Sequence, residues 1–203
     1  MSYNILMQKQ AFIFIGRSGC GKGTQVELLK EKLSNIDREH TSLHIQTGQE
    51  MRRFVEGDTY TQKLSKEINE KGGLQPEFVA IYQWVKVIVE KYSGNEYLIF
   101  DGTPRKIIEA NVLNSIFSFY GIQRVDVLHI DISIQEATKR LLLRKRHDDT
   151  EEDIKNRLAW FETEVNPVIN YYKTNNLYKY HNIDGQGDVK DIFDKLFKSL
   201  ELV

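Results

Sequence analysis

The order of apolar and polar positions along the chain predicts alternating strands and helices. Short apolar runs of the kind that form buried strands recur at residues 11–15, 43–45, 97–100, 125–130 and 178–183. Between them, apolar residues stand three and four positions apart, as on one face of a helix; examples are Val26, Leu29 and Leu33, and then Val79, Trp84, Val87 and Ile88. This alternation predicts an α/β fold of three layers, in which a five-stranded parallel sheet carries helices on both faces.

The clearest helical pattern lies late in the chain. One apolar face is formed there by Ile154, Leu158, Phe161, Val165, Val168 and Tyr172. The pattern predicts a single long helix over residues 153–173. Pro167 lies inside this stretch and lacks the N–H that a helix interior needs, so we expect a bend near it.

Length and net charge restrict the possible partners. A chain of 203 residues suits one compact domain over residues 1–203. The net charge of −1 argues against a nucleic-acid polymer as the main partner, because such partners usually require a basic surface. A small anionic ligand would then have to be held by local positive charge at the carboxyl ends of the strands, where parallel sheets bind their ligands.

Cysteine use and hydropathy indicate the cellular setting. Cys20 is the only cysteine, so neither an internal disulfide nor a thiolate zinc site can be built. The first ten residues lack the charged start and apolar stretch of a signal peptide, and no apolar run approaches membrane-spanning length. We therefore expect a cytoplasmic protein with no membrane partner.

A glycine-rich segment between the first predicted strand and the first predicted helix carries the strongest local signal. It reads Gly16-Arg17-Ser18-Gly19-Cys20-Gly21-Lys22. Glycines let backbone N–H groups turn inward around phosphate oxygens, the helix N-terminus adds favourable partial charge, and Lys22 can reach the outer phosphates. The usual pattern has Ser or Thr directly after the lysine, whereas here Gly23 precedes Thr24. A chance glycine-rich turn is the alternative, but the strand–loop–helix context favours phosphate binding.

The departure from the usual loop is itself informative, because Gly21-Lys22-Gly23-Thr24-Gln25 resembles the start of the adenylate kinase family. Further segments resemble that family's motifs in the same order: Thr47-Gly48 with Met51-Arg52, Gly73-Leu74-Gln75-Pro76, Asp101-Gly102-Thr103-Pro104-Arg105, Arg140 with Arg144 and Arg146, Asp148-Asp149, and Asn156-Arg157-Leu158. Ordered matches over nearly the whole chain are more specific than any single motif. The resemblance implies a P-loop NTPase fold and transfer of a phosphoryl group from Mg-ATP to a nucleoside monophosphate.

Phosphoryl transfer gathers several negative charges, so a site for it needs a lysine, a metal and convergent arginines. The resemblance implies a catalytic set of Lys22, Arg105, Arg144, Arg146 and Arg157. It implies ATP binding by the loop from Gly16 to Thr24 with Arg140 and Arg144. It implies monophosphate binding by Thr47, Gly48, Arg52, Gln75, Gly102, Arg105, Glu109, Arg146 and Arg157. Asp101 would orient Mg²⁺ through water ligands; taken alone, it could simply form a turn.

The resemblance also implies two segments that move on binding. One is a small helical monophosphate-binding insertion at about residues 47–76, and the other is a short lid at about residues 144–150. Gly57, Gly72 and Gly73 are candidate hinges, and Asp148 and Asp149 would position the lid arginines. A lid this short leaves out the insertion that carries a zinc site in some members, so we expect no zinc. Taken alone, the charges near the lid would also fit a solvated helix end.

Three positions depart from the family's motifs: Gln49 stands for Asp, Thr103 for an aromatic residue, and Glu109 for the glutamine that reads the AMP base. A glutamine amide offers one donor and one acceptor, whereas an ionised carboxylate only accepts. Guanine offers two donors at the corresponding edge. AMP is the expected acceptor, with GMP or another monophosphate as the alternative. A protonated Glu109, or one that points away from the base, would remove the conflict.

Two other classes of protein compete with a kinase. A P-loop NTPase or GTPase switch would share Lys22 but would not need five arginines together, namely Arg52, Arg105, Arg144, Arg146 and Arg157. A catalytically inactive nucleotide-binding relative would fit the changes at Gln49 and Thr103. The full arginine set favours the active kinase. The family tends to be monomeric, so the resemblance also implies a monomer.

Overall fold

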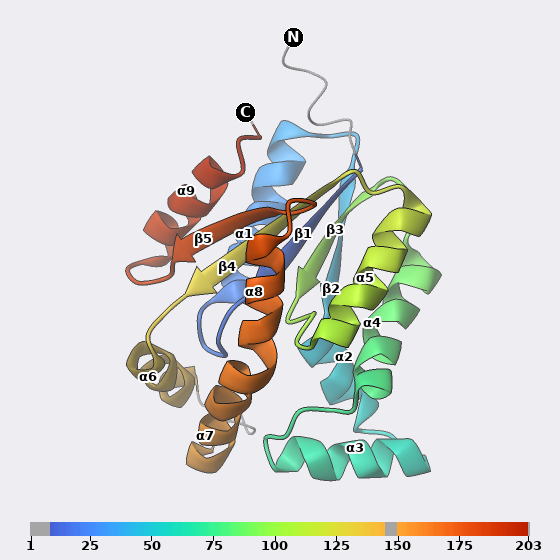
Figure 1. The fold of residues 1–203 in the computed structure, drawn as a ribbon, viewed down its shortest axis with the longest axis vertical. Helices are drawn as coiled ribbons and strands as arrows, with labels where there is room; N and C mark the ends of the chain where they lie inside the picture. The colour runs from blue at the N-terminus through green and yellow to red at the C-terminus, as the bar shows by residue number, and fades with distance from the viewer. Residues whose placement is uncertain (1–8, 145–149, 203) are drawn as a thin grey trace.

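The sheet is described first because it places every other element. The computed structural model describes residues 9–144 and 150–202. All strand pairs are parallel, and the strand order is β2-β3-β1-β4-β5 (Figure 1). The strands are β1 (Gln10–Ile15), β2 (Thr41–Gln46), β3 (Glu96–Asp101), β4 (Arg124–Asp131) and β5 (Lys179–Asp184). The prediction of a five-stranded parallel sheet is therefore confirmed.

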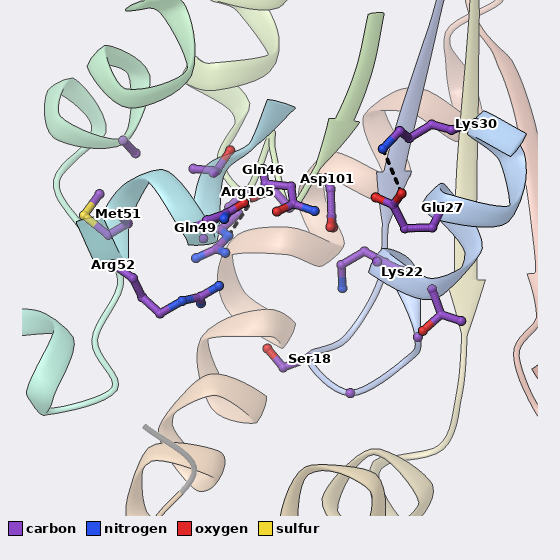
Figure 2. A pocket seen from close by; sticks show the side chains of 18 of the residues that line it. Ser18, Lys22, Glu27, Lys30, Gln46, Gln49, Met51, Arg52, Asp101 and Arg105 are labelled. Atoms are coloured by element: carbon purple, nitrogen blue, oxygen red, sulfur yellow. Dashed lines mark hydrogen bonds and ion pairs between the residues drawn. The ribbon is translucent and has the colours of Figure 1, made fainter. Parts of the chain in front are cut away.

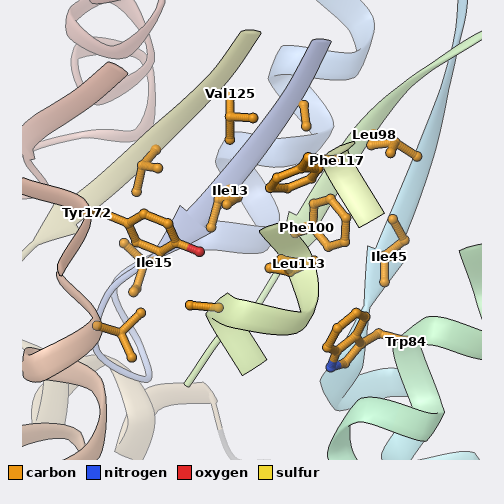
Figure 3. Packing of buried hydrophobic residues seen from close by; sticks show 14 of the residues in the cluster. Ile13, Ile15, Ile45, Trp84, Leu98, Phe100, Leu113, Phe117, Val125 and Tyr172 are labelled. Atoms are coloured by element: carbon orange, nitrogen blue, oxygen red, sulfur yellow. The ribbon is translucent and has the colours of Figure 1, made fainter. Parts of the chain in front are cut away.

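Helices cover both faces of this sheet, as the sequence pattern predicts. Alternate residues of β1 point to opposite faces: Phe12 and Phe14 pack in one buried cluster, whereas Ile13 and Ile15 pack in the other. The first cluster includes apolar residues of α1 (Lys22–Ile36), α6 (Ile134–Arg144) and α9 (Val189–Ser199). The second includes residues of α4 (Glu77–Lys91), α5 (Ile107–Tyr120) and α8 (Asn166–Thr174), shown in Figure 3.

Residues 47–76 form two small helices beyond one end of the sheet (Figure 1). They are α2 (Thr47–Phe54), which directly follows β2, and α3 (Tyr60–Glu70). A capping box between Thr59 and Gln62 starts α3, since each side chain bonds the backbone N–H of the other residue. That these helices form a mobile monophosphate-binding insertion stays a prediction.

The predicted long helix is present, but its irregularity differs from a simple bend. α7 (Glu151–Trp160), a π-helical turn (Phe161–Val165) and α8 follow one another without a break. The π turn lies just before Pro167. Because a proline has no N–H to donate to the carbonyl four residues earlier, the helix widens there instead of continuing regularly.

The covering helices are of ordinary length, with 15 residues in both α1 and α4. Within residues 9–144 and 150–202, no helix combines the length and apolar composition needed to pass through a membrane.

Candidate functional site

The glycine-rich loop connects β1 to α1, and its backbone explains two of its glycines. Gly16 has φ 149°, and a Cβ atom there would lie 2.4 Å from the Ile130 carbonyl oxygen of β4. Gly21 has φ 94° and immediately precedes Lys22, the first residue of α1. These conformations are open to glycine and strained for other residues. The loop therefore ends at a helix N-terminus, where free N–H groups favour an anion.

A cleft of about 1460 Å³ lies at the carboxyl ends of the strands. It is lined by residues from every sequence motif that the structure describes: Ser18, Gly19, Gly21, Lys22, Gly23, Thr24, Thr47, Gly48, Arg52, Gln75, Asp101, Gly102, Arg105, Glu109, Arg140, Arg144 and Arg157. Figure 2 shows Lys22 on one side of this cleft, with Arg52 and Arg105 pointing into it from the other. Segments far apart in sequence are thus brought together around one space.

Some predicted site residues lie elsewhere. Cys20 is 1% exposed and packs in the hydrophobic core rather than lining the cleft. Gly16 also lies away from the cleft lining, and the Arg17 side chain lines a separate pocket of about 420 Å³ beside Asp131. Arg146, Asp148 and Asp149 lie outside the described residues, as does most of the predicted lid.

Lys22 and Asp101 form the centre of the cleft. Lys22 Nζ donates to the carbonyl oxygens of Gly16 at 2.8 Å and Arg17 at 3.0 Å, so its ammonium group lies within the curve of the loop. Asp101 ends β3. Burial would raise the pKa of Asp101, but His44, Lys22 and Arg105 together lower it below its usual value, which keeps the carboxylate ionised.

His44 is a cleft neighbour to which the sequence analysis gave no role. Its Nε2 lies 3.8 Å from Asp101 Oδ2, and its Nδ1 lies 3.2 Å from Glu27 Oε1 of α1. The signal was its strand position: His44 precedes the end of β2 by two residues, and Gln46 pairs with Asp101 across the sheet. His44 therefore lies between the carboxylates of two elements beside the loop.

The donor set at Asp101 fits a magnesium ion held through water. Mg²⁺ prefers oxygen ligands and keeps several waters. Asp101 supplies an ionised carboxylate, and a Cβ atom at Gly23 would come within 3.7 Å of its Oδ2, so glycine leaves extra room there. In the described part of the chain, His, Cys, Asp and Glu side chains form no group of three that would hold a metal directly. Water-mediated binding by one carboxylate remains compatible with this arrangement.

Three arginines lie close enough to influence one another. Arg105 Nε donates to the Gly102 carbonyl oxygen at 2.9 Å. Burial lowers the pKa of Arg105, Glu109 and Asp101 oppose that shift, and the positive charges of Arg157 and Arg52 add to it. This concentration of positive charge favours a strongly anionic ligand.

Trp160 is a second residue whose place the sequence analysis missed. Tyr172, which belongs to the predicted apolar face of this helix, is 0% exposed. Trp160, however, lines the cleft, and the Arg105 guanidinium carbon lies 5.3 Å from its ring centroid. The ring thereby supports the arginine by a cation–π contact.

A chain of hydroxyl groups leads to Glu109. Thr47 Oγ1 donates to Thr103 Oγ1 at 2.8 Å, and Thr103 Oγ1 donates to Glu109 Oε2 at 3.3 Å. Glu109 is 2% exposed, and this burial raises the pKa of its carboxyl group, although Arg105 acts in the opposite direction. Two of the positions that depart from the family's motifs therefore contact each other.

Two further predicted site residues connect elements around the cleft. Gln75 Nε2 donates to the Ser65 carbonyl oxygen of α3 at 2.8 Å. Arg140 pairs with Glu136 one helical turn earlier, at 2.7 Å, and donates to the Gly185 carbonyl oxygen after β5 at 3.0 Å. Arg140 thereby joins α6 to the end of the sheet.

Comparisons with known proteins agree with this geometry. A family model described as adenylate kinase matches residues 14–177. An adenylate kinase of Prochlorococcus marinus (strain MIT 9515) is 37% identical, with the match covering 91% of this chain and 94% of the relative. An adenylate kinase of Leptospira biflexa serovar Patoc (strain Patoc 1 / Ames) is 34% identical over 93% of this chain and 98% of the relative. One of Flavobacterium psychrophilum is 30% identical over 91% and 94%.

Proposed function

This chain belongs to the adenylate kinase family and is a nucleoside monophosphate kinase, and we propose that its acceptor is AMP, so that Mg-ATP and AMP give two molecules of ADP. The proposal rests on one observation above all. Lys22, Arg52, Arg105 and Arg157 come from separate segments and line a single cleft. Such an arrangement suits two nucleotides whose phosphates meet.

The chain's own residues bind and orient the reactants. Lys22, the loop and Arg144 hold the ATP phosphates, while Arg52 and Arg105 hold the phosphate of the monophosphate. Arg157 lies close enough to Arg105 to lower its pKa, and we assign Arg157 to the transferring phosphoryl group between the two nucleotides. Guanidinium groups that converge on the transferring phosphoryl group stabilise the charge that spreads over the equatorial oxygens.

Adenylate kinases use Mg²⁺ with ATP, and Asp101 is the residue that would hold this ion through water. When bound, the ion neutralises charge on the ATP phosphates. Arg146, by its place in the motif, would join the monophosphate side when the lid closes. Arg140 would lie over the ATP base.

Glu109 supports AMP over GMP when it is protonated. A neutral carboxyl group has one donor and one acceptor, which matches the N1 acceptor and the N6 donor of adenine. Burial raises the pKa of Glu109, and Arg105 is the strongest influence that lowers it. A phosphate bound to Arg105 would offset that positive charge, and would therefore favour the protonated form further.

The test measures phosphoryl transfer from Mg-ATP to AMP, GMP, CMP, UMP and dTMP, together with phosphate release in the absence of any acceptor. We expect AMP to exceed GMP in kcat/KM by about tenfold or more, since an unmatched buried polar edge costs roughly 1–3 kcal/mol. The largest kcat/KM with GMP would contradict AMP as the acceptor. Phosphate release without transfer would contradict the kinase assignment itself.

A Glu109→Gln variant tests recognition of the base separately from phosphoryl transfer. In the wild type, we expect kcat/KM for AMP to decline as the pH rises through the raised pKa of Glu109. The Glu109→Gln variant should keep its activity with AMP and should not show this decline. Glu50→Gln is a matched control, because Glu50 lies on α2, pairs with Arg53 at 3.1 Å and does not line the cleft. Identical base preferences and pH profiles in all three proteins would show that Glu109 does not read the base.

A further inference from the structure

We propose that Arg17 is a positioning residue that fixes the phosphate loop to the helix carrying Arg157, so that both are held in register for phosphoryl transfer. This inference rests on the proposed function for Arg157. The sequence analysis placed Arg17 among the ATP-binding residues because it lies within the loop. Its side chain, however, points to other protein groups.

The Arg17 guanidinium joins three elements. Nη1 lies 3.2 Å from Asp131 Oδ1 and donates to the Ile132 carbonyl oxygen at 3.2 Å, both at the carboxyl end of β4. Nη2 lies 2.6 Å from Glu162 Oε1 in the π turn. The guanidinium carbon also lies 4.6 Å from the ring centroid of Phe161. The loop is thus connected to β4 and to the π turn at once.

The other side of this contact is equally well fixed. Phe161 is 2% exposed and belongs to the core between the sheet and its helices. The second carboxylate oxygen of Glu162 accepts from the Asn166 side-chain amide at the start of α8. Arg17 therefore contacts a part of the helix that is itself held in place, and not a freely moving side chain.

The contact between Arg17 and the π turn lies close to Arg157 along the helix. Phe161 follows Arg157 by four residues, so the two lie on neighbouring turns of one helical face. Arg157 lines the main cleft, as do Ser18 and Gly19, which directly follow Arg17 in the loop. A change in the Arg17 contact would rotate or shift the helix by a small amount where Arg157 faces the cleft. Misplacement on the ångström scale is enough to slow a reaction that depends on positioning.

Stability alone does not account for this arrangement. The carboxylates of Asp131 and Glu162 are 48% and 42% exposed as side chains, and ion pairs with such exposure contribute little to folding. Arg17 itself is only 16% exposed as a side chain, and within the described residues its Nε is buried with no hydrogen-bond partner. The guanidinium keeps this orientation although one of its donors stays unsatisfied, which is a cost to folding rather than a gain.

The experiment compares Arg17→Met, Glu162→Gln and Arg157→Ala, alone and combined, using the intact chain with Mg-ATP and AMP. We expect Arg17→Met to lower kcat about tenfold while both KM values stay within about threefold, a size typical of coupling through a packed network. Glu162→Gln should lower kcat less. In the Arg157→Ala background, Arg17→Met should have no further effect on kcat, because it acts through Arg157.

The controls separate a positioning role from the alternatives. Arg53→Met removes an exposed arginine with one ion pair on α2 and should leave kcat unchanged. A raised KM for ATP with normal kcat would overturn the inference in favour of direct ATP binding. A lower Tm with normal kcat would overturn it in favour of a purely structural role. If Arg157→Ala alone kept full kcat, the proposed role of Arg157 would fail first, which distinguishes the two failures.

Discussion

Charged side chains gather at both ends of the sheet, but they are satisfied in different ways. Near the amino end, Asp126 is 0% exposed and both of its oxygens have protein partners. Gln10 Nε2 and Arg124 Nε each lie 2.7 Å from Oδ2, and His181 Nε2 lies 2.8 Å from Oδ1. At the carboxyl end, Arg52, Arg105 and Arg157 surround a cleft and repel one another. The first network stabilises the fold, and the second is arranged for an anionic ligand.

Two buried carboxyl groups show the same difference through their pKa values. Burial would raise the pKa of Asp126, but His181, Arg124 and Gln10 lower it below the usual value. Burial raises the pKa of Glu109, and the opposing influence of Arg105 does not reverse that shift. A carboxylate with complete partners stays ionised, whereas one beside an open cleft keeps its proton more readily.

Among the substitutions that test this difference between the two ends of the sheet, removing the charge of Asp126 should have the largest effect. Asp126→Asn would leave Arg124 buried without its carboxylate, so we expect a loss of about 3–5 kcal/mol in the free energy of unfolding. The loss should shrink as the pH falls through the lowered pKa of Asp126, because the wild-type carboxylate is then protonated as well. Urea unfolding at several pH values measures this. If Asp126→Asn left the free energy of unfolding unchanged but reduced kcat, that would contradict the stabilising role assigned to the amino end of the sheet.

Lys22→Met tests the carboxyl end of the sheet, where we expect a loss of activity rather than of stability. Because Lys22 stabilises charge that develops on the phosphates, we expect kcat to fall by about 10²–10³-fold. The free energy of unfolding should change little, since the hydrogen bonds of the ammonium group within the described part of the chain go to loop carbonyls and the Cys20 sulfur. Steady-state kinetics and urea unfolding of the same sample provide both values. A large loss of stability with nearly normal kcat would contradict the assignment.

Glu109→Gln should have the smallest effect of the three substitutions, and it should stabilise the fold rather than weaken it. An acid with a raised folded pKa binds its proton more tightly in the folded state, so wild-type stability declines as the pH rises from the ordinary value of 4.5 towards the raised pKa. The glutamine variant lacks this decline. We expect it to be more stable than the wild type by about 1 kcal/mol near neutral pH, the lower end of the cost of a poorly matched buried group. The difference should disappear below pH 4.5, and a variant less stable than the wild type at neutral pH would contradict the shift.

The sequence predicts the framework well because the framework follows from local patterns. The apolar run at residues 11–15 lies within β1, and the glycine-rich segment after it forms the expected loop into α1. Parallel strands end at one edge of a sheet, so the motifs that follow β1, β2 and β3 had to meet. That argument alone places Lys22, Arg52 and Arg105 around one cleft.

What the sequence leaves out are contacts between side chains that are distant in the chain. Nothing local to Arg17 indicates that it pairs with Glu162, which follows it by 145 positions. The approach of Thr103 to Glu109 depends on how a loop folds back on α5, and the partners of Asp126 come from three strands. Such contacts are set by tertiary packing, for which periodicity carries no signal.

The central claim is that one cleft holds two nucleotides with their phosphates facing each other. Calorimetric titration with a bisubstrate analogue, two adenosines joined by five phosphates, tests it most directly. We expect one analogue to bind per chain with Mg²⁺ present, to exclude both ATP and AMP, and to bind at least about tenfold more weakly after Arg105→Met. An analogue that displaced ATP while AMP still bound with unchanged affinity would contradict the account.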